Sequence, residues 1–220
     1  MPNPAGFIAD LAVPAAIDEV QRVPELMLES LSRDLGIPER TLRSYLGLLT
    51  TLFLVTRLPA WSSNLLSRET KAPKVSISDS GLLLALLGAD AERIVSDPQL
   101  AGLVIETFVA NEVTRLAEAL VIRPRLYHLR DRDGREVDLI IERRDGMVAA
   151  VEVKSSATVG PKDFRGLRYL RQRLGDRFLV GCVLYTGRAT VPAGGGLWAV
   201  PVSALWGGGA PYMSRERQEP

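Results

Sequence analysis

Histidine and cysteine are nearly absent from this sequence. One histidine, His128, and one cysteine, Cys182, occur among 220 residues. Zinc sites built from cysteine and histidine, disulfide frameworks and mechanisms that need two histidines are therefore excluded. Cys182 lies in an apolar run and is expected to be a small core residue. His128 is expected to be a surface or packing residue of a strand rather than a catalyst.

Long apolar runs, an excess of charge and a phosphate-binding loop are missing too. No apolar run reaches the ~20 residues of a membrane span, and no basic-then-apolar leader opens the chain, so we expect a cytoplasmic protein without a membrane partner. The formal net charge is +1, so attraction to a polyanion must come from local patches. The chain contains no G-x-x-x-x-G-K-[ST] loop, and ATP is therefore not expected as a cofactor.

The most informative stretch is a predicted β-hairpin. Two runs rich in aliphatic and β-branched residues flank a glycine-bearing turn. The two runs and the turn are residues 135–142, 147–156 and 144–146. Side chains alternate between the faces of a strand, so Glu152 and Lys154 share one face, and Val151 and Val153 line the other. A carboxylate and an ammonium are therefore expected side by side.

The length of the turn decides whether Asp138 joins them. A two-residue loop would set Asp138 opposite Val153, facing away from Glu152. A three-residue loop, with Gly146 in the left-handed conformation, sets Asp138 opposite Glu152. We predict the three-residue loop.

That register would gather two carboxylates and a lysine on one patch. Hard cations such as Mg²⁺ prefer carboxylate oxygens, and Lys154 could stabilise charge on a phosphate or position the attacking water. The pattern therefore fits a Mg²⁺-dependent phosphodiester hydrolase. The competing interpretation is an exposed, salt-bridged hairpin without catalysis.

A third acid is expected on a helix over about residues 101–120. Its apolar stripe consists of Gly102, Ile105, Val109, Val113, Leu116 and Leu120. Glu106 lies on one edge of this stripe and Glu112 on the other. Periodicity alone does not choose between them, and an edge glutamate that merely reaches solvent is the alternative.

The N-terminal half has the proportions of a helix-turn-helix. A helix over about residues 27–35 and a second one that starts at Pro38 are followed by the β-prone run 52–55 and a turn-rich segment, which suggest a wing. Arg40 and Arg43 on the second helix could touch phosphates. A winged helix used only for packing or protein contacts is the alternative.

Five segments together resemble the domain of unknown function 4143, which has a PD-(D/E)XK nuclease-like fold and forms the C-terminal part of a group of prokaryotic AAA+ family ATPases. The segments are residues 74–83, 106–112, 132–138, 151–156 and 163–167. The resemblance covers about residues 27–206. It implies an α/β (α+β) fold, with a restriction-endonuclease-like mixed sheet flanked by helices after a small winged-helix-like domain. It also implies Glu106 as the helix acid.

The resemblance further implies how the chain is divided. The expected parts are an ATPase remnant over residues 1–26, a winged-helix-like domain over 27–70, a connector over 71–100, the nuclease-like domain over 101–206 and a disordered tail over 207–220. Residues 17–26 resemble a Walker B segment, but the Walker A half is missing. We therefore expect a truncated relative without ATPase activity.

Two functions follow as hypotheses. The first is a nucleic-acid-associated, nuclease-like domain, in which Asp138 and Glu152 hold Mg²⁺, Glu106 assists and Lys154 acts on the phosphate or the water. The second is a non-catalytic module that binds DNA, a protein partner or further copies of itself.

Overall fold

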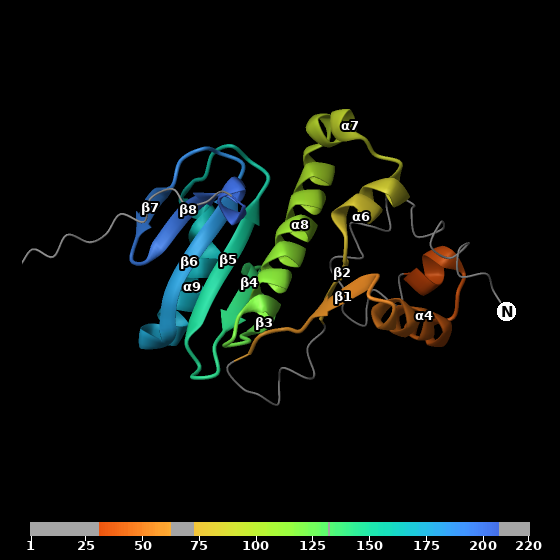
Figure 1. Cartoon of the computed structure of the whole chain (residues 1–220), viewed down its shortest axis with the longest axis horizontal. Coiled ribbons are helices and arrows are strands. Elements are labelled where there is room, and N and C mark those ends of the chain that lie inside the picture. Colours follow the sequence, from red (N-terminus) through yellow and green to blue (C-terminus); the bar gives the residue numbers. More distant parts are fainter. Residues whose placement is uncertain (1–30, 63–72, 132, 207–220) are drawn as a thin grey trace, which may run out of the picture.

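A six-stranded mixed sheet with helices on both faces forms the C-terminal part of the protein (Figure 1). The computed structural model describes residues 31–62, 73–131 and 133–206. The predicted ATPase remnant and the predicted disordered tail lie outside these residues. The predicted α/β class, with a mixed sheet flanked by helices, is confirmed.

The strand order is β3-β4-β5-β6-β8-β7. The strands are β3 (Arg125–Arg130), β4 (Glu136–Glu142), β5 (Val148–Lys154), β6 (Phe178–Tyr185), β7 (Val191–Gly194) and β8 (Leu197–Pro201). Strands β3, β4 and β5 pair antiparallel, β5, β6 and β8 run parallel, and β7 pairs antiparallel with β8. The edge strand β7 was not predicted, because its sequence, Val-Pro-Ala-Gly, carries a proline and a glycine that weaken the strand pattern.

The two faces of the sheet have separate cores. On one face, α9 (Arg165–Leu174), preceded by the 3-10 turn η1 (Pro161–Phe164), buries its predicted inner side. This inner side consists of Phe164, Leu167, Leu170 and Leu174. On the other face, Val109 and Val113 of α8 (Pro98–Ala119) pack against Val151 and Val153. The face of β5 that carries the valines is therefore the face covered by α8.

The apolar run of β6 is less buried than its sequence indicates. A continuous apolar run predicts burial on both faces. However, Leu179 is 44% and Val180 is 40% exposed, because only the second half of the strand lies in the packed cores.

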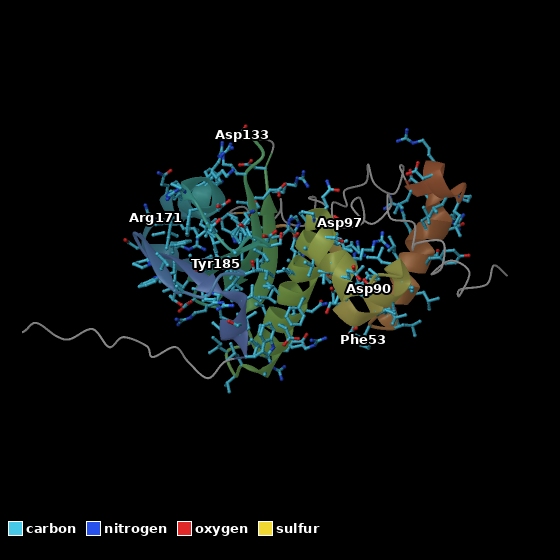
Figure 2. The ribbon with its side chains drawn as sticks, turned by 90° about the horizontal axis from the view of Figure 1, so that it is seen from above. Phe53, Asp90, Asp97, Asp133, Arg171 and Tyr185 are labelled. Atoms are coloured by element: carbon cyan, nitrogen blue, oxygen red, sulfur yellow. The ribbon has the colours of Figure 1, made fainter. Side chains whose placement is uncertain are left out.

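Aspartate caps start three successive helices, and Figure 2 labels the last two of these aspartates, Asp90 and Asp97. The helices are α6 (Ser80–Leu87), α7 (Ala91–Ser96) and α8. Asp79, Asp90 and Asp97 each accept a hydrogen bond from a backbone N–H of the first turn. The cap at Asp97 and the proline after it start α8 at Pro98, three residues before the predicted start.

The predicted apolar stripe of α8 is wrong at its C-terminal end. Leu116 and Leu120 are each 49% exposed, whereas Leu100, Leu103 and Val104 are buried. The last three pack with Leu83 of α6 in a separate cluster. Helix α8 is therefore buried on two sides, against the sheet and against α6, and one stripe cannot describe it.

The N-terminal unit contains a helix over residues 31–35, which is the described part of the helix predicted over 27–35, followed by α4 (Glu39–Thr51). It also contains a two-stranded antiparallel sheet of β1 (Val55–Leu58) and β2 (Lys74–Ile77). Strand β1 begins three residues later than the β-prone run predicted over 52–55. The delay arises because the chain turns at Leu52 and at Phe53, which has a φ of 57°. Strand β2 lies in the segment that was predicted to be a connector. Figure 1 shows α8 between this unit and the large sheet.

A short segment after β1 connects the N-terminal unit to β3, the edge strand of the large sheet, through backbone hydrogen bonds. Ala60 bridges to His128 of β3, and the Trp61 N–H donates to the His128 carbonyl at 2.6 Å. The side chain of Trp61 is 1% exposed and belongs to the core on the α9 face. This fixed position of β1 and β2 brings Lys74 to the acids described next.

Candidate functional site

The hairpin of β4 and β5 has the predicted three-residue turn. Arg143 N–H donates to the Met147 carbonyl at 2.9 Å, and Gly146 has a φ of 81°. The ladder then runs to the pair Leu139 and Val151, in the register that sets Asp138 opposite Glu152. The predicted register is confirmed.

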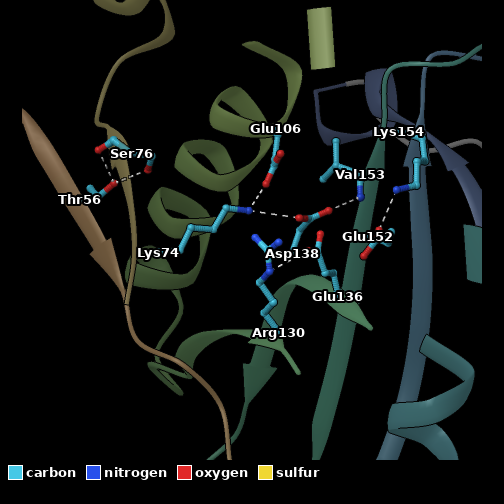
Figure 3. A network of polar contacts seen from close by, with 10 residues as sticks. All are labelled: Thr56, Lys74, Ser76, Glu106, Arg130, Glu136, Asp138, Glu152, Val153 and Lys154. Carbon is cyan, nitrogen blue, oxygen red and sulfur yellow. Dashed lines mark hydrogen bonds and ion pairs between the residues drawn. The ribbon is translucent and has the colours of Figure 1, made fainter. Parts of the chain in front are cut away.

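A β-bulge changes where Asp138 points. Tyr127 of β3 pairs with Ile140 and Leu129 pairs with Val137, so Asp138 and Leu139 together stand opposite one residue of β3. A bulge of this kind redirects the side chains of the bulged strand. Asp138 consequently points toward α8 and β2 (Figure 3).

The carboxylate of Asp138 has two partners. One oxygen, Oδ2, accepts a hydrogen bond from Val153 N–H at 2.9 Å, beyond the pair Leu139 and Val151 that ends the β4–β5 ladder. The other, Oδ1, lies 3.1 Å from Nζ of Lys74. The side chain is 14% exposed. The carboxylate of Asp138 is thus largely buried, and it is held in place by a backbone N–H and an ammonium.

Glu106 reaches the same ammonium from α8. Its Oε1 forms an ion pair with Lys74 Nζ, and the two side chains are 24% and 15% exposed. Lys74 therefore bridges Glu106 and Asp138, as Figure 3 shows. Glu112, the alternative helix acid, instead pairs with Arg115 and accepts from Trp206 Nε1 at 3.3 Å.

Glu152 and Lys154 form a second pair on β5. Lys154 Nζ donates to Glu152 Oε1 at 2.8 Å. Because Val151 and Val153 pack on the α8 face, the alternating Glu152 and Lys154 lie on the side of α9. Glu152 is 8% exposed, and its Oε2 is buried without a hydrogen-bond partner among the described residues.

Burial dominates the ionisation of this pair. It raises the pKa of Glu152 to about 8, with Asp138 adding to the rise and Lys154 opposing it. Burial alone would lower the pKa of Lys154, but the Glu152 and Asp138 carboxylates outweigh it, so the pKa of Lys154 lies above its ordinary value. In this structure burial therefore makes Glu152 harder to ionise than an ordinary glutamate.

The stability of the fold should decrease as pH rises, because of Glu152. The stabilising effect of a raised carboxyl pKa is complete below the ordinary value of 4.5 and is lost as pH rises through about 8. One such group contributes a slope of at most about 1.4 kcal/mol per pH unit. Urea unfolding at several pH values between 4.5 and 8 should show this slope in wild type and lose it in Glu152→Gln.

Asp145→Asn is the control for that measurement, because Asp145 is a half-exposed acid of the hairpin turn, paired with Arg143. It should retain the wild-type slope. Parallel curves for wild type and Glu152→Gln would contradict the assignment of the raised pKa to Glu152.

The predicted site residues thus fall into two adjacent groups. Lys74 joins Glu106 and Asp138, and Glu152 joins Lys154. Over residues 31–62, 73–131 and 133–206, no three acids, histidines or cysteines form a group that could hold a metal ion. The single patch expected from the register is therefore divided, because the bulge turns Asp138 away from the face of Glu152.

Sequence reasoning missed Lys74. It falls in the connector predicted over residues 71–100, and nothing local places it near an acid 32 or 64 residues further along the chain. The signal that could have found it is the alternation of Lys74-Val75-Ser76-Ile77, which predicts a strand.

His128 and Cys182 both lie outside the two groups of site residues. The backbone of His128 forms hydrogen bonds with residues 59 and 61. The free thiol of Cys182 packs beside the core on the α8 face, and burial raises its pKa to about 12.

Comparison with known proteins supports the domain that the sequence resembles. Residues 101–205 match the domain of unknown function DUF4143. The region preceding this DUF4143 match, residues 20–93, matches a second domain of unknown function, DUF8612. The two matches share no residue, and Lys74 lies in the second while Glu106, Asp138, Glu152 and Lys154 lie in the DUF4143 match.

Two mycobacterial proteins are similar to most of the chain. They are Uncharacterized protein Rv2008c of Mycobacterium tuberculosis and Uncharacterized protein Mb2031c of Mycobacterium bovis, each 31% identical over 176 residues. The alignments cover 80% of this chain and 38% of each relative. No solved structure matches the chain. Among the helices of the described residues, none has the length and apolar character needed to cross a membrane.

Proposed function

We propose that the DUF4143 region is a PD-(D/E)XK nuclease-like domain that hydrolyses phosphodiester bonds of nucleic acids with Mg²⁺. The observation that carries the proposal is the buried, unpartnered Oε2 of Glu152, on the strand that also presents Lys154 and next to Asp138. A buried carboxylate oxygen without a partner is costly, and a cation would satisfy it.

The donors have the chemistry that Mg²⁺ prefers, since Asp138, Glu152 and Glu106 all supply carboxylate oxygens. They form no ready-made metal group among the described residues, because the bulge turns Asp138 away from the face of Glu152. Asp138 and Glu152 would therefore hold the ion, with Glu106 assisting, once Asp138 turns toward Glu152. When bound, the ion would supply positive charge to the scissile phosphate and acidity to a water molecule. No step of the proposed reaction uses ATP.

Lys154 has the freedom to act on a phosphate. An ammonium has three N–H donors, and the pair with Glu152 uses one of them. The side chain of Lys154 is 36% exposed, so the remaining donors can reach a substrate at the surface. Its proposed role is to donate hydrogen bonds to the phosphate oxygens as negative charge develops there.

Helix α9 offers a surface for the nucleic-acid backbone on the same face of the sheet. Its ten residues include four arginines and no acid. Three of the guanidinium groups are held by backbone carbonyls: Arg165 by Asp133, Arg168 by Pro161 and Arg171 by Gly195. A carbonyl fixes the position of a guanidinium without cancelling its charge, which favours contact with phosphates.

Removing two of these arginines should weaken binding to nucleic acid. Arg165→Gln with Arg168→Gln removes two charges at the start of α9, and the slope of log K against log salt should fall by about 2 units on duplex DNA. Fluorescence anisotropy with a labelled duplex measures this slope. Arg40→Gln with Arg43→Gln on α4 is the matched control. A fall only in that control would move the binding surface to the N-terminal unit.

The test of the proposed activity is cleavage of labelled single-stranded and double-stranded DNA and RNA. Purified protein should cleave at least one of them with Mg²⁺ or Mn²⁺ and stop when the metal is chelated, and Asp138→Asn should be inactive. Equal cleavage by wild type, Asp138→Asn and Lys154→Ala would identify a contaminant. No cleavage by wild type on any of these substrates would contradict the proposal.

One observation favours the second hypothesis, a non-catalytic binding module. Lys74 already neutralises part of the charge of Glu106 and Asp138, and Lys154 pairs with Glu152, so all three acids have a cationic partner within the chain. In that case Glu106 and Asp138 fasten β2 to α8 and β4, and the arginines of α9 bind nucleic acid without cleavage. Binding in the anisotropy experiment together with no cleavage would support this function.

A further inference from the structure

We infer that Lys74 is a built-in competitor of the divalent cation, so that the carboxylates of Glu106 and Asp138 bind either its ammonium or the metal ion. The inference rests on the proposed function, since it concerns the same acids. It adds a residue of the N-terminal unit that controls whether the site can accept a metal.

The position of the ammonium excludes simultaneous binding. Lys74 Nζ pairs with Glu106 Oε1 and lies 3.1 Å from Asp138 Oδ1, so it occupies the space between the two acids (Figure 3). A metal ion that used these same oxygens would need that space, at a distance of about 2.1 Å from each. Lys74 would have to withdraw first.

The charges lead to the same conclusion. Glu106 and Asp138 together carry two negative charges, and the bridging ammonium cancels one of them. All three side chains are at most 24% exposed, so solvent screens their interaction less than it would at an open surface. Loss of the ammonium would leave two poorly hydrated carboxylates facing each other, which is the arrangement that a divalent cation stabilises.

The competing charge comes from a separate structural unit. Lys74 is the first residue of β2 and pairs with Leu58 of β1, whereas the acids lie on α8 and β4. Asn111 of α8 holds the far end of β2 through its Nδ2, which donates to the Ile77 carbonyl at 3.0 Å. A displacement of β2 would therefore move the Lys74 ammonium away from Glu106 and Asp138. By linkage, a cation bound to these acids would weaken the attachment of β2.

The test measures Mn²⁺ binding alone, without substrate, by the free-Mn²⁺ signal in electron paramagnetic resonance. Lys74→Gln should bind Mn²⁺ at least about 10-fold more tightly than wild type, as expected when one of two competing cations is removed. Arg57→Gln, which removes an exposed charge from the neighbouring strand β1, should bind as wild type does. Lys74→Arg keeps the charge and should not gain affinity.

Adding Asp138→Asn to Lys74→Gln should abolish the gain in Mn²⁺ affinity. That result would assign the bound ion to the Glu106 and Asp138 pair. Equal and measurable affinity in wild type and Lys74→Gln would overturn the role of Lys74 but leave the proposed metal site intact. Weaker binding by a folded Lys74→Gln would overturn it too and make Lys74 a positioning residue for the acids. No binding by any variant would overturn both this inference and the proposed cofactor.

Discussion

Replacing Asp138 with asparagine should lower metal-dependent cleavage by about 100-fold or more, which is the loss expected when a group that supports transition-state charge is removed. Asparagine keeps the shape of the side chain, and its carbonyl oxygen can still accept the hydrogen bond from Val153 N–H. It loses the negative charge that faces Lys74 and that would face a cation. The change therefore separates charge from packing.

Asp145→Asn is the matched control. Asp145 also accepts from a backbone N–H, that of Met147, and pairs with the cationic side chain of Arg143, but it lies in the hairpin turn away from the acids. Both variants should fold, since a hydrogen bond to a charged group contributes about 1.5–3 kcal/mol. Equal kcat in Asp138→Asn and Asp145→Asn would remove Asp138 from the proposed site.

Gly166→Ala should be the most destabilising small substitution in the C-terminal part. Helix α9 packs so closely on β4 that a Cβ at residue 166 would overlap the carbonyl oxygen of Glu136 and lie 3.1 Å from a methyl group of Val137. A backbone carbonyl cannot rotate away as a side chain can, so the helix must shift. We expect a loss of about 3 kcal/mol or more in the free energy of unfolding.

Gly47→Ala on α4 separates this clash from helix propensity. A Cβ at residue 47 would have no atom within 4 Å, so alanine should stabilise the helix by up to about 1 kcal/mol. Chemical denaturation of both variants gives the comparison. A Gly166→Ala protein as stable as wild type would mean that α9 does not contact β4 as described.

The hairpin was the part of the fold most accessible to sequence reasoning. Its register depends on an adjacent turn, and Gly146 in the left-handed conformation identifies the three-residue loop. The bulge at Asp138 was not accessible, because it is a mismatch between β4 and a third strand, β3, and no residue of the hairpin itself signals it. The bulge is nevertheless what decides the direction of Asp138.

The long-range contacts explain the remaining differences. Periodicity locates the helix α8, but it cannot tell that α6 buries a second side of it, and so it overestimated the burial of Leu116 and Leu120. It identifies Glu106 as an edge acid without naming its partner. That partner, Lys74, comes from a strand whose own pairing with β1 spans a long intervening segment.

The central claim is that the acids next to the hairpin bind a catalytic metal, and a crystal of the Lys74→Gln protein soaked in Mn²⁺ tests it most directly. Anomalous scattering should show a peak within about 2.5 Å of a carboxylate oxygen of Asp138 and of a carboxylate oxygen of Glu106 or Glu152. The absence of a peak there, at a Mn²⁺ concentration that supports cleavage in solution, would contradict the account.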